Sequence, residues 1–140
     1  MKPLYFLVFL FALASFDSAA CSCRKSDPNA LISQSDNVLI GRVTKLEMKT
    51  DESGEEYQKV TLSNAKTYKG NSSPVLYSYF DGSFCRGNRF ELGVKHIVFL
   101  DEKNWTTGYC GGTRAIYSGN PETISIVEAL NKLSTNKTLN

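Results

Sequence analysis

The sequence has a single histidine and only four cysteines among its 140 residues. His96 stands in the apolar stretch 94–100, where a lone histidine is typically a packed or partly exposed strand residue. Acidic residues crowd the polar segment 51–56, as expected of a solvated loop. Neither a nucleophile with a base nor paired carboxylates nor a metal cluster emerges. We therefore expect a protein that is not an enzyme and has no cofactor of its own.

The chain also lacks an excess of charge of one sign. Its formal net charge is +2, which predicts neither a nucleic-acid partner nor attraction to a membrane surface. There is no internal repeat, and nothing indicates more than a monomer.

A long apolar run is missing too. The one strongly apolar stretch, Pro3–Phe16, is short for the roughly 20 residues of a membrane-spanning helix. It follows Lys2 and precedes the small residues 18–20, an arrangement typical of a secretory signal peptide cleaved after Ala20. We expect residues 1–20 to be removed and the protein to be secreted into the extracellular space.

A bacterial lipoprotein signal is the alternative, because it also ends just before a cysteine and would acylate Cys21. Ser18 argues against it, since such signals favour a larger aliphatic residue at that point. With cleavage after Ala20, the mature chain begins with a free α-amine on Cys21.

Residues 21–140 are long enough for one domain with a single modest core. Asp27 before Pro28 predicts a helix start, and so does Asn120 before Pro121. The C-terminal helix carries apolar residues at helical spacing, namely Ile124, Val127, Leu130 and Leu133. We expect residues 134–140 to fray.

Runs of branched and aromatic residues between turn signals predict the strands. The expected elements are helices over 28–34 and from 121, and strands over 37–48, 57–68, 75–80, 94–100 and 104–110. The apolar run 97–100 indicates burial on both faces of its strand. Five short strands with little helix predict a mainly β fold, a small barrel or sandwich.

All four cysteines, Cys21, Cys23, Cys85 and Cys110, follow the cleavage site. An even number in a secreted chain predicts two disulfides. Three pairings are open: a tight Cys21–Cys23 ring with Cys85–Cys110, or two long-range bonds in either arrangement. Each long-range bond would contribute roughly 4–5 kcal/mol in the chain-entropy model.

Three sequons for N-glycosylation also follow the cleavage site. They begin at Asn71, Asn104 and Asn136. Sequons this short arise often by chance and matter only in a eukaryotic protein.

Several motifs, in order, resemble the tissue inhibitors of metalloproteinases. Cys21-Ser22-Cys23, Pro28 and Ser35-Asp36-Asn37-Val38 resemble the start of the family's mature chains, with matching spacing. Tyr68-Lys69-Gly70 resembles the aromatic-Lys-Gly that ends the family's second strand, and Ser83-Phe84-Cys85 resembles its Ser-x-Cys. The resemblance covers about residues 21–115, the inhibitory domain.

The resemblance implies an OB-fold-like five-stranded Greek-key barrel, the netrin-like module, with a short N-terminal and a C-terminal helix. It also implies the disulfides Cys21–Cys85 and Cys23–Cys110. The α-amine and carbonyl of Cys21 would chelate the catalytic zinc of a matrix-type metalloproteinase.

The same resemblance implies the other inhibitory contacts. Ser22 would enter the pocket beside the zinc, while Cys23, Arg24 and Lys25 would follow the cleft. Ser83 and Phe84 would flank them.

The chain departs from the family at a few points. Ser33 stands where the family has a further cysteine, and Arg24-Lys25 replaces a more usual apolar-Pro pair. The cysteine-rich C-terminal subdomain has no counterpart among these residues. The alternative function is a non-inhibitory netrin-like extracellular module that binds a matrix or signalling partner.

Overall fold

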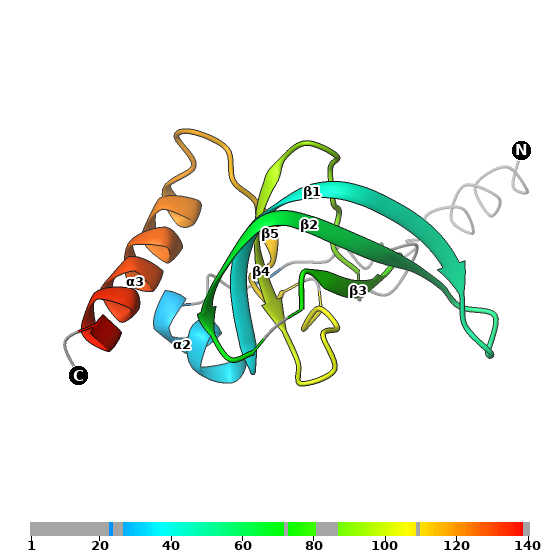
Figure 1. The fold of residues 1–140 in the computed structure, drawn as a ribbon, viewed down its shortest axis with the longest axis horizontal. Coiled ribbons are helices and arrows are strands. Elements are labelled where there is room, and N and C mark those ends of the chain that lie inside the picture. Colours follow the sequence, from blue (N-terminus) through cyan, green and yellow to red (C-terminus); the bar gives the residue numbers. More distant parts are fainter. Residues whose placement is uncertain (1–22, 24–26, 72, 81–86, 109, 139–140) are drawn as a thin grey trace, which may run out of the picture.

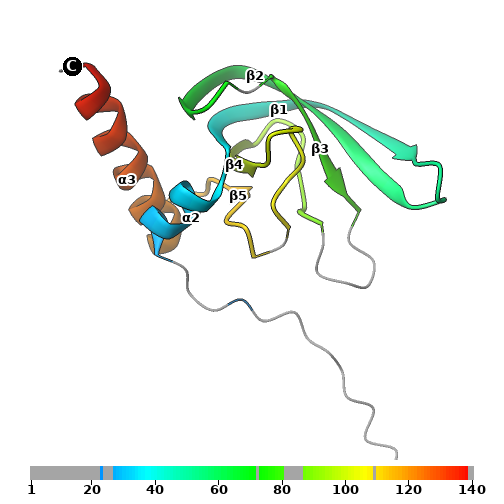
Figure 2. The same ribbon diagram turned by 90° about the horizontal axis from the view of Figure 1, so that it is seen from below.

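The computed structural model describes residue 23 and the ranges 27–71, 73–80, 87–108 and 110–138. The fold is mainly β, with one five-stranded antiparallel sheet and two helices (Figures 1 and 2). The strand order is β3-β2-β1-β4-β5. The elements are α2 (Pro28–Gln34), β1 (Asn37–Thr50), β2 (Glu56–Lys69), β3 (Val75–Tyr79), β4 (Lys95–Leu100), β5 (Arg114–Ala115) and α3 (Pro121–Thr138).

The long hairpin β1–β2 dominates the sheet. The first part of β1 pairs with both β2 and β4, whereas its last part pairs with β2 alone and extends outward as an arm (Figure 1). Register shifts interrupt the pairing with β2 between Val38 and Lys45, and such bulges bend and twist a strand. At the tip, Asp51 Oδ1 accepts hydrogen bonds from Ser53 N and Glu55 N at 2.8 and 3.0 Å. The segment 51–56 is thus the exposed turn of this hairpin, in agreement with the expected solvated loop.

The prediction of a strand over 104–110 is wrong, because the fifth strand of the sheet is β5. Residues 104–107 form only single bridges. Tyr77 N donates to Asn104 O and Thr106 N to Tyr77 O, while Asp101 N donates to Trp105 O. Asn104 has a φ of 64° and Gly108 a φ of 93°, so the chain turns before a longer ladder can form. This segment lies between β3 and the end of β4.

The apolar residues form two cores on opposite faces of the sheet. The inner core contains side chains of the strands and one residue before β4: Leu39, Val43, Val60, Leu62, Leu76, Phe90, Val98 and Leu100. The outer core joins the other face to both helices: Leu31, Ile32, Val38, Ile97, Phe99, Ile126 and Leu130. Successive residues of β4 therefore enter different cores, which confirms its predicted burial on both faces.

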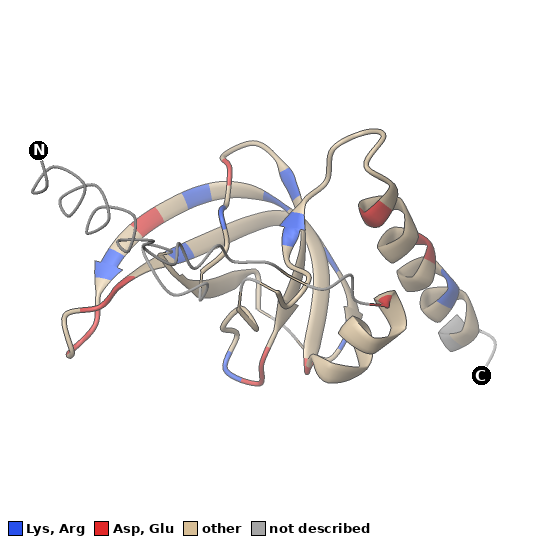
Figure 3. Ribbon diagram, turned by 180° about the vertical axis from the view of Figure 1, so that it is seen from behind, with Lys and Arg blue, Asp and Glu red and all other residues tan. Residues whose placement is uncertain are grey.

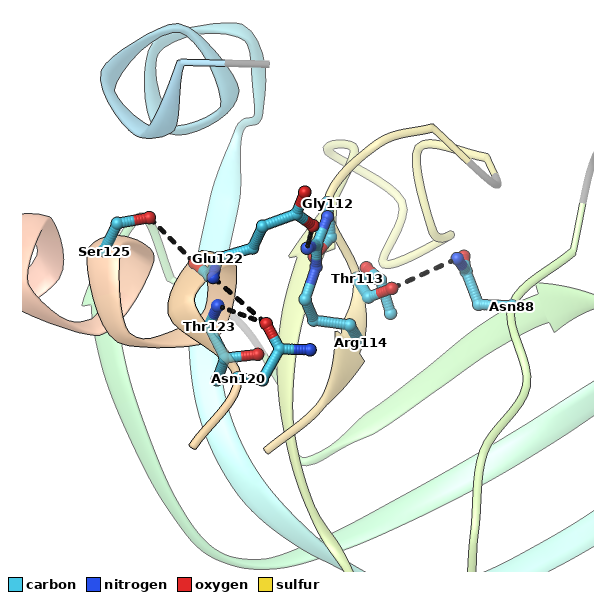
Figure 4. Close-up of polar contacts among 8 residues, drawn as sticks. All are labelled: Asn88, Gly112, Thr113, Arg114, Asn120, Glu122, Thr123 and Ser125. Carbon is cyan, nitrogen blue, oxygen red and sulfur yellow. Dashed lines mark hydrogen bonds and ion pairs between the residues drawn. The ribbon is translucent and has the colours of Figure 1, made fainter. Parts of the chain in front are cut away.

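Helix α3 begins as predicted, because Asn120 Oδ1 accepts hydrogen bonds from Glu122 N and Thr123 N (Figure 4). Its buried face differs from the prediction. Ile126 is 2% exposed, while Ile124 and Leu133 are 48% and 41% exposed. A strict three-residue spacing rotates around a helix of 3.6 residues per turn, so its members cannot all face one core. The helix continues to Thr138, past Ser134 where the polar tail was expected to begin.

Neither α2 nor α3 has the length and hydropathy needed to cross a membrane, and these are the helices of the described ranges.

Candidate functional site at the N-terminal segment

A disulfide ties the N-terminal segment to the far part of the chain. Cys23 is bonded to Cys110, with their Cα atoms 5.4 Å apart across 87 residues of sequence. The predicted pairing of these two cysteines is confirmed. The tight Cys21–Cys23 ring and the crossed arrangement are both excluded, because each needs a different partner for Cys23. Cys21–Cys85 is the pairing that remains, and it stays a prediction.

Most of the residues that the resemblance assigns to inhibition lie outside the described residues. They are Cys21, Ser22, Arg24, Lys25, Ser83 and Phe84, and Cys85, the predicted disulfide partner of Cys21, also lies outside. Cys23, which is exposed, is the one member of the inhibitory set whose position is described. The candidate site therefore consists of the elements that hold Cys23 and its neighbours.

Helix α2 carries the segment into the outer core. Asp27 Oδ2 accepts a hydrogen bond from Ala30 N at 3.2 Å, which satisfies one of the free donors at the helix start. Leu31 and Ile32 are buried against the sheet and α3. The predicted cap and helix are confirmed, and they fix the chain four residues after the disulfide.

Lys69 holds the other end of α2. Its Nζ donates to Ile32 O at 2.9 Å, Ser33 O at 3.1 Å and Ser35 O at 2.6 Å. A cation at a helix C-terminus is favourable because it bonds carbonyls that lack partners within the helix. The sequence motif Tyr68-Lys69-Gly70 was recognised, but no role for this lysine was predicted. A lysine in a sequence carries no signal for the distant carbonyls that it bonds in the folded chain.

Two of the motifs that carry the resemblance meet next to Lys69. Asn37 Oδ1 accepts from Asn71 N at 2.9 Å, and Asn37 Nδ2 donates to Asp101 O at 3.0 Å. Gly70 has a φ of 73°, and a Cβ there would lie 2.1 Å from Asn37 Oδ1. Only glycine fits both this backbone conformation and this close approach. Asn37 and Gly70 thus connect the start of β1 to the ends of β2 and β4.

A small cavity of about 300 Å³ lies beside the disulfide. It is lined by Leu31, Gln34 and Ser35 from the α2 side and by Thr107, Cys110 and Gly111 from the loop after β4. Gly112, with a φ of 90°, packs against Leu31 and Phe99, so the loop approaches the helix closely. The turn at Gly111 and Gly112 therefore positions Cys110.

Buried polar contacts fix the chain on either side of the range 81–86. The Ser78 hydroxyl accepts from Asn88 N at 3.1 Å and from Thr106 Oγ1 at 3.0 Å. Asn88 Nδ2 donates to Thr113 O at 3.4 Å (Figure 4). Thr113 Oγ1 in turn accepts from Phe99 N at 2.9 Å. This network was not predicted, because isolated serines, threonines and asparagines carry no pattern that marks burial.

The single histidine is a packed strand residue, as expected. His96 is fully buried, with its ring 5.1 Å from that of Phe90 and its Nδ1 3.2 Å from Val94 O. Among the described residues, no partner meets the usual hydrogen-bond geometry at its Nε2. Burial, which disfavours the charged imidazolium, lowers the pKa of His96 below its usual 6.5, and hydrogen bonding to Val94 partly opposes this.

The three sequons differ in their surroundings. Asn71 and Asn136 are exposed, whereas Asn104 is half-buried in the turn that follows β4. Within the described ranges, no group of three or more histidine, cysteine or acidic side chains could hold a metal ion.

Together these features define a class of small, mainly β domain whose N-terminal segment is disulfide-bonded to the loop after β4. In the comparisons with known proteins, no family model and no curated protein matches the chain.

Proposed function

We propose that the protein is a secreted inhibitor of zinc metalloproteinases of the matrix type, which inserts its N-terminal Cys21-Ser22-Cys23 into the active-site cleft. The Cys21 α-amine and carbonyl bind the catalytic zinc of the target. The resemblance of the motifs supports this proposal. The alternative remains a netrin-like module that binds an extracellular partner without touching zinc.

An OB-fold-like barrel is the fold that we infer. Its support is the position of residues 104–107, which hydrogen-bond to Tyr77 of β3 on one side and to Phe99 and Asp101 at the end of β4 on the other. With β1 paired to both β2 and β4, the order runs from β1 through β2, β3 and the 104–107 segment to β4, and back to β1. Such closure is typical of small Greek-key barrels.

The Cys23–Cys110 disulfide is the observation that carries the proposal. It fixes the chain two residues after the proposed zinc ligand, while α2 and Lys69 fix the residues after Asp27. A ligand held in its bound conformation loses less entropy when it binds. The predicted Cys21–Cys85 bond would complete this restraint.

The chemistry needs the terminus that signal cleavage creates. An α-amine has a pKa near 7.7–8.0, so near neutral pH it gives up its proton to a metal far more readily than a lysine. Coordination by the amine and carbonyl would displace the water that a zinc proteinase activates as its nucleophile. Ser22 would then lie in the adjoining pocket, with Arg24 and Lys25 along the cleft and Ser83 and Phe84 beside them.

A one-residue extension tests the proposal. Adding one alanine before Cys21 moves the α-amine away from the zinc, and inhibition of a matrix metalloproteinase catalytic domain should be lost. The matched control carries the added alanine after Asn140 and should inhibit as the parent protein does. Mass spectrometry verifies that the parent begins at an unmodified Cys21.

Two results would argue against the proposal. Equal inhibition by both extended proteins would exclude the amine as the ligand. A parent protein with an authentic N-terminus and an intact Cys23–Cys110 bond, but without effect on a panel of zinc proteinases, would favour the binding module.

A further inference from the structure

Four aromatic side chains gather on the surface of β2, β3 and the 104–107 segment. Trp105 lies over three tyrosines, with ring centroids 4.7 Å from Tyr79, 5.4 Å from Tyr77 and 5.4 Å from Tyr57. The rings of Tyr57 and Tyr77 meet edge-on at 6.2 Å. We call Tyr57, Tyr77, Tyr79 and Trp105 the aromatic face.

The aromatic face points away from the inner core. Along β2 and β3 the alternate residues Gln58, Val60, Leu76 and Ser78 are buried, so the tyrosines between them project to the opposite side. All four aromatic residues are only half-buried. Their rings therefore offer apolar surface to solvent, beyond what the packing of the 104–107 segment covers.

The polar edges of these rings have no partners within the described part of the chain. No hydrogen bond involves the three tyrosine hydroxyls or the indole N–H of Trp105 among those residues. Each tyrosine hydroxyl can donate and accept, and the indole can donate. The aromatic face thus combines stacking surface with several hydrogen-bonding groups at its rim.

Charge around the aromatic face is sparse and mixed. Lys59 lies opposite Tyr77 in the strand register, Glu56 precedes Tyr57, and the Asp101 carboxylate accepts from Trp105 N at 2.9 Å. In Figure 3 the basic residues are spread along the strands of the sheet, and acidic residues lie at the tip of the β1–β2 hairpin. A strand of nucleic acid needs a positively charged groove along its backbone, and this surface does not supply one.

We propose that the aromatic face binds a neutral oligosaccharide. Pyranose rings present flat C–H faces that stack on aromatic rings, and their hydroxyls both donate and accept, as the tyrosine hydroxyls do. A proline-rich peptide, the other common ligand of surface aromatics, offers mainly carbonyl acceptors. In OB-type barrels the face formed by the second and third strands is a common place for oligosaccharides. The proposal does not depend on zinc chelation.

The protein's only tryptophan reports on this surface alone. Titration of the purified, disulfide-bonded protein with cellohexaose and with chitohexaose should give a saturable change in tryptophan fluorescence for at least one of them. A Kd below about 1 mM is expected, and calorimetry gives an independent value.

Paired variants locate the site. Tyr79→Ala should weaken binding by about tenfold or more, since its ring stacks most closely on Trp105. Tyr79→Phe retains the ring and should lose less affinity. The matched control Tyr117→Ala removes another exposed tyrosine, 49% exposed and outside the aromatic face, and should bind as the parent does. Thermal unfolding of each variant checks that it is folded.

The proposal fails if neither hexasaccharide binds at concentrations up to about 10 mM. It also fails if a folded Tyr79→Ala protein binds as tightly as the parent. Binding of only a proline-rich peptide or a single-stranded oligonucleotide would assign the surface to another ligand. Sugar binding should persist in the protein with alanine added before Cys21, which separates this proposal from the inhibitor proposal.

Discussion

The inner and outer cores are of similar size but are built from different parts of the chain. The inner core comes almost entirely from alternate residues of β1–β4, which pair with one another directly. The outer core exists only because α2 and α3 pack onto the sheet. Helix α2 follows the disulfide-bonded Cys23 closely in the sequence. The comparison indicates that the inner core determines whether the sheet forms, whereas the outer core determines where the proposed inhibitory segment is held.

Removal of the disulfide tests this division most strongly. The double variant Cys23→Ser with Cys110→Ser should lose about 4–5 kcal/mol of the free energy of unfolding, because 87 residues separate the bonded cysteines. Denaturant unfolding measures the loss. Far-UV circular dichroism should still show the sheet at low denaturant. A loss below about 1 kcal/mol would mean that α2 is held without the bond.

A matched pair of isoleucines in α3 tests the outer core. Ile126→Ala should cost about 2–4 kcal/mol because it leaves a cavity in the outer core, where Ile126 is buried. Ile124→Ala, two residues away and 48% exposed, should cost less than about 1 kcal/mol. Urea unfolding of both variants provides the comparison. Equal losses would contradict the observed orientation of α3.

Lys69→Met tests the restraint on α2 from the sheet. It removes the ammonium that bonds three carbonyls at the helix end, and a loss of about 1–3 kcal/mol is expected. Lys103→Met, at an exposed lysine of the loop after β4, is the control and should change stability little. Weaker inhibition by the folded Lys69→Met protein would connect this restraint to function. If Lys69→Met and Lys103→Met have equal stability, Lys69 does not stabilise the end of α2.

The buried His96 should make the free energy of unfolding of the protein depend on pH. Its pKa is lowered in the folded protein, chiefly by burial, whereas the unfolded chain takes up the proton near pH 6.5. Below about pH 6.5 the unfolded state therefore binds more protons, and stability should fall by up to about 1.4 kcal/mol per pH unit until the folded pKa is reached. Urea midpoints at pH 7.5 and 5.0 measure the loss.

The variant His96→Leu separates the contribution of His96 from every other pH-dependent contribution to stability. It should show a smaller drop in midpoint between the two pH values than the parent. If the urea midpoint falls equally in the parent and in His96→Leu, groups other than His96 cause the pH dependence.

The sequence predicted the inner core better than the outer one, for a physical reason. Strand geometry places successive residues on opposite faces, so the apolar residues around Val60 predicted a strand and the continuous run 97–100 predicted burial on both faces. The outer core depends on how a helix is rotated against the sheet. A chain with apolar residues at 124, 126, 127, 130 and 133 allows more than one such rotation, and in the folded protein Ile126 and Leu130 are the ones buried in the outer core.

Some features of the candidate site could be predicted from the sequence, and others could not. The pairing of Cys23 with Cys110 was implied by the family resemblance alone, whereas the cap at Asp27 could be expected from local chemistry. The contacts of Lys69 and of Ser78 could not, because they join residues distant in sequence through groups that also occur on ordinary surfaces. Such contacts depend on the assembled fold.

Metal coordination by the Cys21 α-amine is the central claim, and a cobalt-substituted metalloproteinase catalytic domain tests it most directly. The visible spectrum of the bound Co²⁺ responds to a change in its ligands. The protein that begins at Cys21 should alter this spectrum at equimolar amounts, whereas the protein with alanine added before Cys21 should leave it unchanged. The same spectrum with both proteins, or no change with the authentic N-terminus, would contradict the account.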